Sequence, residues 1–143
     1  MNRIGHGWCM SKDIDVMKRC IEKKVPVEIC LTSNVKPGAG KEWIETYEQH
    51  PVRQMYDAGV KLCINSDNLL ISGGADREAN PTTEIEHFMN ECQFSLLEIC
   101  ELLRNGVDAS FYHTEEERMN MLSIFDQEIQ NILSEHQRSF EKL

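Results

Sequence analysis

Two short segments of the chain carry residues that could do chemistry. His6 lies between Gly5 and Gly7 near the start of the sequence, and Asp67 follows an apolar run at residues 60–64. A parallel β/α barrel presents its catalytic groups at the carboxyl ends of its strands, where an imidazole on a glycine turn and a carboxylate after a strand would both lie. Together the two residues predict one side of a metal site.

Each residue also has an ordinary structural explanation. Glycines are required wherever the backbone turns tightly, and a histidine between them can be a core residue with satisfied hydrogen bonds. An aspartate after a strand often forms an Asx turn or a helix cap, and Asn68 beside Asp67 fits the same local role. The combination of the two segments, more than either alone, favours a functional site.

Composition narrows the class of protein. The chain has 143 residues, 41% of them hydrophobic, which is enough for one domain with a core. Its 24 acidic and 15 basic residues give a net charge of −9, which argues against nucleic acid as a partner. No signal peptide is evident and no stretch approaches the ~18 apolar residues of a membrane span, so we expect a cytoplasmic protein with no membrane partner.

The six cysteines are scattered and lie inside apolar patterns. No two of them have the C-x-x-C spacing of a structural zinc site, and the chain lacks the secretory features that accompany disulfides. The sequence therefore predicts buried thiols at Cys9, Cys20, Cys30, Cys63, Cys92 and Cys100.

Hydrophobic periodicity predicts alternating strands and helices in the first half of the chain. The expected strands are 3–6, 27–31 and 60–65, the second ended by the polar group 32–34. The expected helices are 13–24, 43–49 and 51–58, with Gly59 as the C-terminal cap of the last. Strands joined by helices through short connections favour right-handed crossovers and a parallel sheet.

Everything after Asp76 is predicted to be helical. Three helices are expected: one begun by Asn80-Pro81 and running to about Cys92, one with a Ser95–Glu98 capping box and ending at Gly106, and one with a Thr114–Glu117 capping box. The last presents an apolar face made of Leu122, Phe125, Ile129, Ile132 and Leu133. We therefore expect one partial domain at 1–143, with βα units that carry the site motifs at 1–75 and a helical part at 76–143.

Four motifs occur in an order and at intervals that resemble the adenosine deaminase family. They are Arg3-Ile4-Gly5-His6-Gly7, the run from Glu28 to Asn34, His50-Pro51, and the run from Ile64 to Asn68. Similarities at 70–73, 77–78, 109–111 and 115–117 extend the resemblance over nearly the whole chain. The family is a zinc-dependent TIM (β/α)8 barrel that hydrolyses adenosine to inosine and ammonia. The resemblance implies an α/β fold, the C-terminal part of such a barrel, with the three expected strands as its sixth, seventh and eighth.

The resemblance also assigns roles, position by position. Asp67 would be the carboxylate ligand of Zn²⁺, His6 the imidazole that orients the metal-bound water and helps to deprotonate it, and Asn68 a contact to the purine. Zinc lowers the pKa of bound water toward ~7, and an imidazole with a pKa near ~6.5 can hold that water and accept its proton. Asn68 stands where many members have aspartate, but its amide N–H can still donate to purine N7.

The rest of the family's site would lie before Met1, namely three histidine ligands and a glutamate that acts as the proton donor. A catalytic zinc normally has three or more protein ligands, so one carboxylate cannot hold it. We therefore expect a truncated or split form of a longer protein, inactive without an N-terminal half-barrel or a partner chain. The remaining histidines lack ligand spacing and are expected to face solvent: His50, His87, His113 and His136.

Two classes of function stay open. In the first, the chain is part of a deaminase that acts on adenosine, or on AMP, adenine or N6-methylated purine nucleotides, because the loops that set specificity would follow earlier strands. In the second, it is a non-catalytic half-barrel interaction module that binds a partner through an exposed sheet edge or through its helical C-terminal part.

Overall fold

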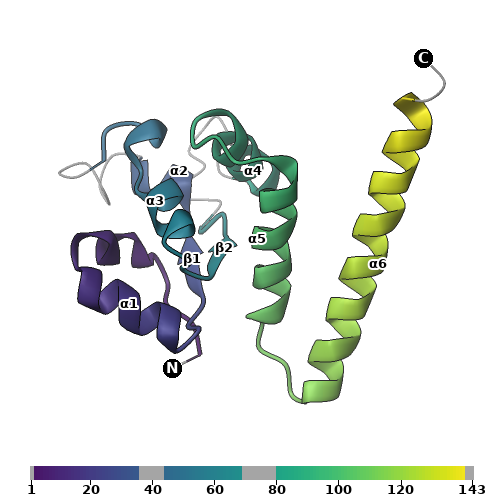
Figure 1. Cartoon of the computed structure of the whole chain (residues 1–143), viewed down its shortest axis with the longest axis horizontal. Coiled ribbons are helices and arrows are strands. Elements are labelled where there is room, and N and C mark those ends of the chain that lie inside the picture. The colour runs from purple at the N-terminus through teal and green to yellow at the C-terminus, as the bar shows by residue number, and fades with distance from the viewer. Residues whose placement is uncertain (1, 36–43, 69–79, 141–143) are drawn as a thin grey trace.

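A small parallel sheet lies at the centre of the chain, in a computed structural model that describes residues 2–35, 44–68 and 80–140 (Figure 1). Strand β1 (Val27–Ile29) pairs with β2 (Leu62–Ile64) in parallel, with Val27 opposite Leu62. Ile4 adds one parallel bridge on the other side of β1, where it accepts a hydrogen bond from the Glu28 N–H at 2.8 Å. The order Ile4, β1, β2, with helices between the strands, is consistent with a partial α/β barrel.

The expected strand at 3–6 is wrong in extent, because only Ile4 pairs with the sheet. His6 turns into the left-handed region at φ 50°, and the 3-10 helix η1 (Gly7–Lys12) begins directly after it, so the chain leaves the sheet at once. The strands expected at 27–31 and 60–65 form but are shorter. Leu31 begins the short helix α2 (Leu31–Val35), so the polar residues 32–34 lie inside a helix and do not end a strand.

The helices of the first half agree with local signals. Helix α1 (Ile14–Glu22) begins after Asp13, whose carboxylate accepts hydrogen bonds from the N–H groups of residues 15 and 16. Helix α3 (Val52–Asp57) is followed by Gly59, which has φ 90° as a C-terminal cap requires.

The helix expected at 43–49 is wrong. Residue 43 lies outside the described residues, and the remainder holds only the 3-10 turn η2 (Tyr47–Gln49). His50 is extended at ψ 130° because the ring of Pro51 disfavours a helical conformation in the residue before it.

All three capping predictions for the second half are confirmed. Helix α4 (Pro81–Asn90) is capped by Asn80, α5 (Leu96–Asp108) has the Ser95–Glu98 capping box, and α6 (Glu115–Phe140) has the Thr114–Glu117 pair. Helix α5 continues two residues beyond the expected end at Gly106. The structure contains no helix, among the residues it describes, that is long and apolar enough to cross a membrane.

Helix α6 packs on α5 only along its first part (Figure 1). Leu122 is buried and Phe125, Ile129 and Leu133 are half-buried, as the predicted apolar face requires. Ile132 is the exception, with 58% of its surface exposed. With 26 residues against 13, α6 is much longer than the helix it packs against.

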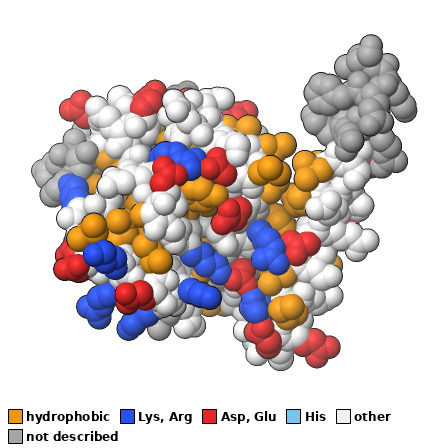
Figure 2. Space-filling view, viewed as in Figure 1, with side chains coloured by type: hydrophobic (Ala, Val, Ile, Leu, Met, Phe, Trp, Pro, Cys, Tyr) orange, Lys and Arg blue, Asp and Glu red, His pale blue; other side chains and the backbone are white. Residues whose placement is uncertain are grey.

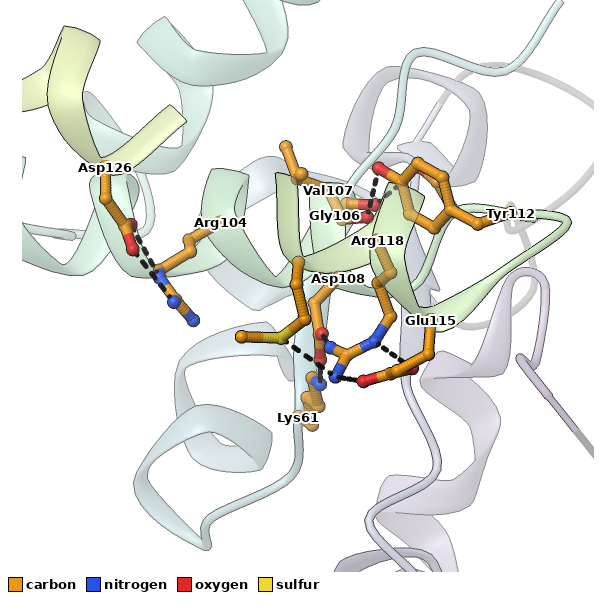
Figure 3. A network of polar contacts seen from close by, with 11 residues as sticks. Lys61, Arg104, Gly106, Val107, Asp108, Tyr112, Glu115, Arg118 and Asp126 are labelled. Carbon is orange, nitrogen blue, oxygen red and sulfur yellow. Dashed lines mark hydrogen bonds and ion pairs between the residues drawn. The ribbon is translucent and has the colours of Figure 1, made fainter. Parts of the chain in front are cut away.

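Ion pairs fix the start of α6 (Figure 3). Asp108, the last residue of α5, pairs with Lys61 just before β2 and with Arg118 on α6. One turn earlier on α5, Arg104 donates two hydrogen bonds of 2.7 and 3.0 Å to Asp126 on α6. Figure 2 shows acidic and basic side chains mixed on this face, with apolar side chains between α6 and the rest of the molecule.

The core surrounds the sheet. Its fully buried members include Val27, Ile29, Leu62, Phe88 and Leu102. The prediction of six buried thiols holds for four cysteines, while Cys9 is exposed and Cys100 is half-buried. Cys9 lies between Trp8 and Met10, and the tight 3-10 turn buries these two neighbours and leaves Cys9 on the outside.

Gly7 offers a test of this packing. A Cβ at this position would lie 2.5 Å from Val27 Cγ1 and 3.1 Å from Met10 Cε. Val27 is fully buried and β-branched, so it cannot withdraw, and we expect Gly7→Ala to lower the free energy of unfolding by about 1–3 kcal/mol. Gly106→Ala is the matched control: nothing lies within 4 Å of its added Cβ inside α5, and it should raise stability by up to about 1 kcal/mol. Urea unfolding measures both, and equal effects would contradict the packing.

Candidate functional site

The structure brings His6 and Asp67 together. His6 Nε2 lies 3.5 Å from Asp67 Oδ2, and the two side chains are 45% and 32% exposed. His6 follows the Ile4 bridge and Asp67 follows β2, so the two residues reach each other across the carboxyl end of β1. Asn68 comes directly after Asp67 and is exposed. An imidazole and a carboxylate therefore meet at the carboxyl end of the sheet, and both side chains are partly exposed.

Both residues of this pair have left-handed backbone conformations. His6 has φ 50° and Asp67 has φ 58°, and among the described residues only Lys24 and Gln93 share this feature outside glycine. Histidine and aspartate tolerate this region better than most residues, but it still costs free energy. Such conformations persist where the surroundings hold them, which is common at functional sites.

Ser33 holds the carboxylate of Asp67. Its hydroxyl donates a hydrogen bond of 2.6 Å to Asp67 Oδ2, the same oxygen that faces His6. Ser33 belongs to α2, which starts two residues after β1 ends. Nothing in the sequence pointed to a role for Ser33, although it lies within one of the motifs that carry the family resemblance.

A buried amide lies between two imidazoles. Asn34, 1% exposed, is 3.1 Å from His6 Nδ1 on one side and 2.9 Å from His50 Nε2 on the other. The other ring nitrogen of His50, Nδ1, accepts the N–H of Val52 at 3.1 Å, at the start of α3. His6 is therefore anchored to the interior through Asn34 and His50.

The expectation that the other histidines face solvent is only partly correct. His50 is 4% exposed, and burial lowers the pKa of its ring to about 4. It is buried because the bend before Pro51 turns it into the core, where both ring nitrogens have partners. His87 is half-buried and stacks on Tyr47 at 3.8 Å. His113 is exposed, and the side chain of His136 lies outside the described residues.

Glu84 positions the helix that carries Ser33 and Asn34. Its carboxylate, fully buried, accepts the N–H groups of Leu31 at 2.8 Å and Thr32 at 3.1 Å, the first two residues of α2. Burial raises the pKa of Glu84, and the hydrogen bonds from Thr32 and Leu31 oppose that rise. No sequence signal marked Glu84, because its role depends on a contact between segments far apart in the chain.

Cys30 is no nucleophile, although it lies close to this site. Burial, followed by the charge of Asp67, raises the pKa of its thiol to about 12. The thiol is therefore neutral at physiological pH, and a neutral thiol is a weak nucleophile.

A metal needs more ligands than this part of the chain supplies. In the ranges 2–35, 44–68 and 80–140, no three His, Cys, Asp or Glu side chains come close enough to hold an ion. A catalytic zinc normally has three protein ligands. Asp67 alone does not fit a zinc ion, and it can only be one ligand of a site completed by other residues.

Comparison with known proteins identifies the family. Residues 1–128 match the family model described as adenosine deaminase, so the chain belongs to the adenosine deaminase family. The adenosine deaminase of Clostridium acetobutylicum is 35% identical over 125 residues, which are 87% of this chain and 34% of that protein. The chain thus spans about a third of the length of the curated relatives that it matches.

Solved structures agree in fold. The adenine deaminase of Arthrobacter aurescens matches with a TM-score of 0.73 at 25% identity, over 91% of this chain and 37% of that one. The N6-methyl-AMP deaminase of Arabidopsis thaliana matches with a TM-score of 0.68 at 28% identity, over 88% of this chain and 34% of that one. The arrangement of His6, Asp67 and Ser33 is thus built on a deaminase fold.

The buried ring of His50 gives a pH prediction. The unfolded ring takes up a proton near its ordinary pKa of 6.5, whereas the folded ring does so only near 4. Stability from this residue is complete above pH 6.5 and is lost as the pH falls toward 4, by about 3 kcal/mol. We expect the difference in the free energy of unfolding between the wild type and His50→Gln, measured with urea between pH 4 and 7, to shrink as the pH falls. The exposed control His113→Gln should retain the slope of the wild type, and a difference independent of pH would contradict the assignment.

Proposed function

We propose that this chain is the part of a zinc-dependent adenosine deaminase barrel that supplies the carboxylate ligand, Asp67, and the active-site imidazole, His6. The observation that carries the proposal is the meeting of these two side chains across the end of β1 in a member of this family. In this proposal Ile4, β1 and β2 correspond to the sixth, seventh and eighth strands of the barrel. Residues 1–143 then form one partial domain, with the site at 1–75 and supporting helices at 76–143.

Each residue of the site has a definite task in this proposal. Zinc, when bound, makes water acidic enough to serve as a nucleophile at neutral pH. Asp67 contributes one ligand oxygen, and Ser33 fixes the orientation of that carboxylate through its 2.6 Å hydrogen bond. His6 orients the attacking water, and Asn68 donates an amide N–H to purine N7.

The remaining groups must come from another part of a complete barrel. The described residues supply too few ligands, and this chain matches about a third of the Clostridium acetobutylicum enzyme. We propose that a half-barrel equivalent to the unmatched part of such relatives, on the same polypeptide or on a partner chain, supplies the other zinc ligands and the acid that protonates the purine. Nothing in the described part of the chain favours a non-catalytic interaction module instead.

Adenosine is the substrate that we propose. The basis is the 35% identity to a curated adenosine deaminase, which exceeds the identity to the adenine and N6-methyl-AMP deaminases of known structure. Adenine, AMP and N6-methylated purine nucleotides remain the alternative substrates within the same chemistry.

Complementation tests this proposal. The chain is combined with the N-terminal part of the Clostridium acetobutylicum enzyme, and conversion of adenosine to inosine is followed by ultraviolet absorbance, with zinc measured by mass spectrometry. We expect activity and bound zinc in the mixture and neither in the chain alone, because one ligand cannot retain the ion. Stoichiometric zinc and turnover in the chain alone would contradict the proposal.

Two adjacent substitutions separate the proposed ligand from the proposed substrate contact. Asp67→Asn should remove zinc from the complemented enzyme and lower activity at least about a hundredfold, because a neutral amide is a far weaker ligand than a carboxylate. Asn68→Asp should retain zinc and cost less than about tenfold, because a protonated carboxyl can still donate to N7. Comparable losses in the two variants would refute this division of roles.

A further inference from the structure

The backbone N–H of Val52 determines where His50 carries its proton. This N–H is a donor, and it lies 3.1 Å from His50 Nδ1, so Nδ1 must act as the acceptor and cannot be protonated. A neutral imidazole has one protonated nitrogen, which is therefore Nε2. The low pKa of the buried ring, about 4, agrees with a neutral state. His50 thus presents an Nε2–H donor to the amide of Asn34.

The orientation of the Asn34 amide follows from this donor. With Nδ2 at 2.9 Å from His50 Nε2 and Oδ1 at 3.1 Å from His6 Nδ1, two donors would face each other at His50. Amide oxygen and nitrogen occupy nearly equivalent positions, so the hydrogen-bond network decides between the two orientations. The orientation that satisfies every group has Oδ1 accepting from His50 Nε2–H and Nδ2 donating to His6 Nδ1.

We propose that Asn34, oriented by His50, is a positioning residue that holds His6 in the tautomer with Nδ1 as acceptor and Nε2–H toward Asp67. Asn34 is 1% exposed, His50 is 4% exposed and Val52 is fully buried, so solvent does not compete for the hydrogen bonds that join these three residues. The order of donors is continuous: Val52 to His50, His50 to Asn34, Asn34 to His6, and His6 toward Asp67, whose Oδ2 lies 3.5 Å from Nε2.

The consequence concerns what His6 can do. In this tautomer, Nε2–H of His6 donates to an oxygen at the site, either the Asp67 carboxylate or a lone pair of the attacking water. It does not offer a lone pair at Nε2, so this network gives His6 an orienting role and does not make it a proton acceptor at that atom. The orienting role of His6 in catalysis rests on the proposed function, whereas its tautomer follows from the hydrogen bonds of this chain alone.

Nuclear magnetic resonance of the ¹⁵N-histidine-labelled chain measures the tautomers without zinc or substrate. In two-bond ¹H–¹⁵N spectra at neutral pH, we expect Nε2 to be the protonated nitrogen in both His50 and His6. In Asn34→Asp, the carboxylate accepts from both rings, so His50 should be unchanged and Nδ1 of His6 should become protonated. Asn120→Asp is the matched control, because it makes the same change at an exposed position of α6, and it should leave both tautomers as in the wild type. A wild-type His6 protonated at Nδ1, or no change in Asn34→Asp, would overturn the proposal.

A second pair of variants covers the case in which Asn34→Asp does not fold. His50→Gln retains an N–H donor toward Asn34, so His6 should keep its tautomer, whereas His50→Leu removes the donor and should leave His6 as a mixture. The same response in both variants would contradict the role of His50. In the complemented enzyme, Asn34→Asp should retain zinc and lower kcat by about 10–100-fold with little change in KM. The expected spectra together with an inactive complemented wild type would uphold the tautomer and reject the proposed function.

Discussion

The contact between Glu84 and the start of α2 is the interaction on which the site depends. A glutamate side chain is seldom fully buried, and here two backbone N–H groups at a helix start donate hydrogen bonds to it. Leu31 and Thr32 immediately precede Ser33 and Asn34, the residues that contact Asp67 and His6. One carboxylate from α4 therefore sets the position of both hydrogen bonds that hold the candidate pair.

The site has an exposed side and a buried side, and they do different work. The side chains of Asp67 and His6 are partly exposed to solvent. Asn34 and His50 are buried, and they fix the ring of His6 on its buried side. The left-handed backbone at His6 and Asp67 needs such support, because neither conformation is favourable by itself. Strain at His6 and Asp67 is thus opposed by the hydrogen bonds that these residues form with Asn34 and Ser33.

The sequence predicted best what is determined locally. The caps at Asn80, Ser95 and Thr114 depend on residues within one helical turn, and they form as expected. The end of the strand at 27–31 could not be found this way, because α2 begins where Glu84 reaches it from a distant segment. The meeting of His6 and Asp67 was expected from their motifs. The burial of His50 was not, because it depends on a tertiary contact that no periodicity in the sequence records.

Orientation and metal affinity are separate properties of this site. Among the described residues, the contacts that orient His6 and Asp67 come from the amide of Asn34, the hydroxyl of Ser33 and, behind them, Glu84 and His50. Metal affinity depends instead on the number of ligands, and the same residues supply too few of them. The geometry of these side chains follows from short contacts around α2, whereas the affinity for an ion follows from how many ligands reach it.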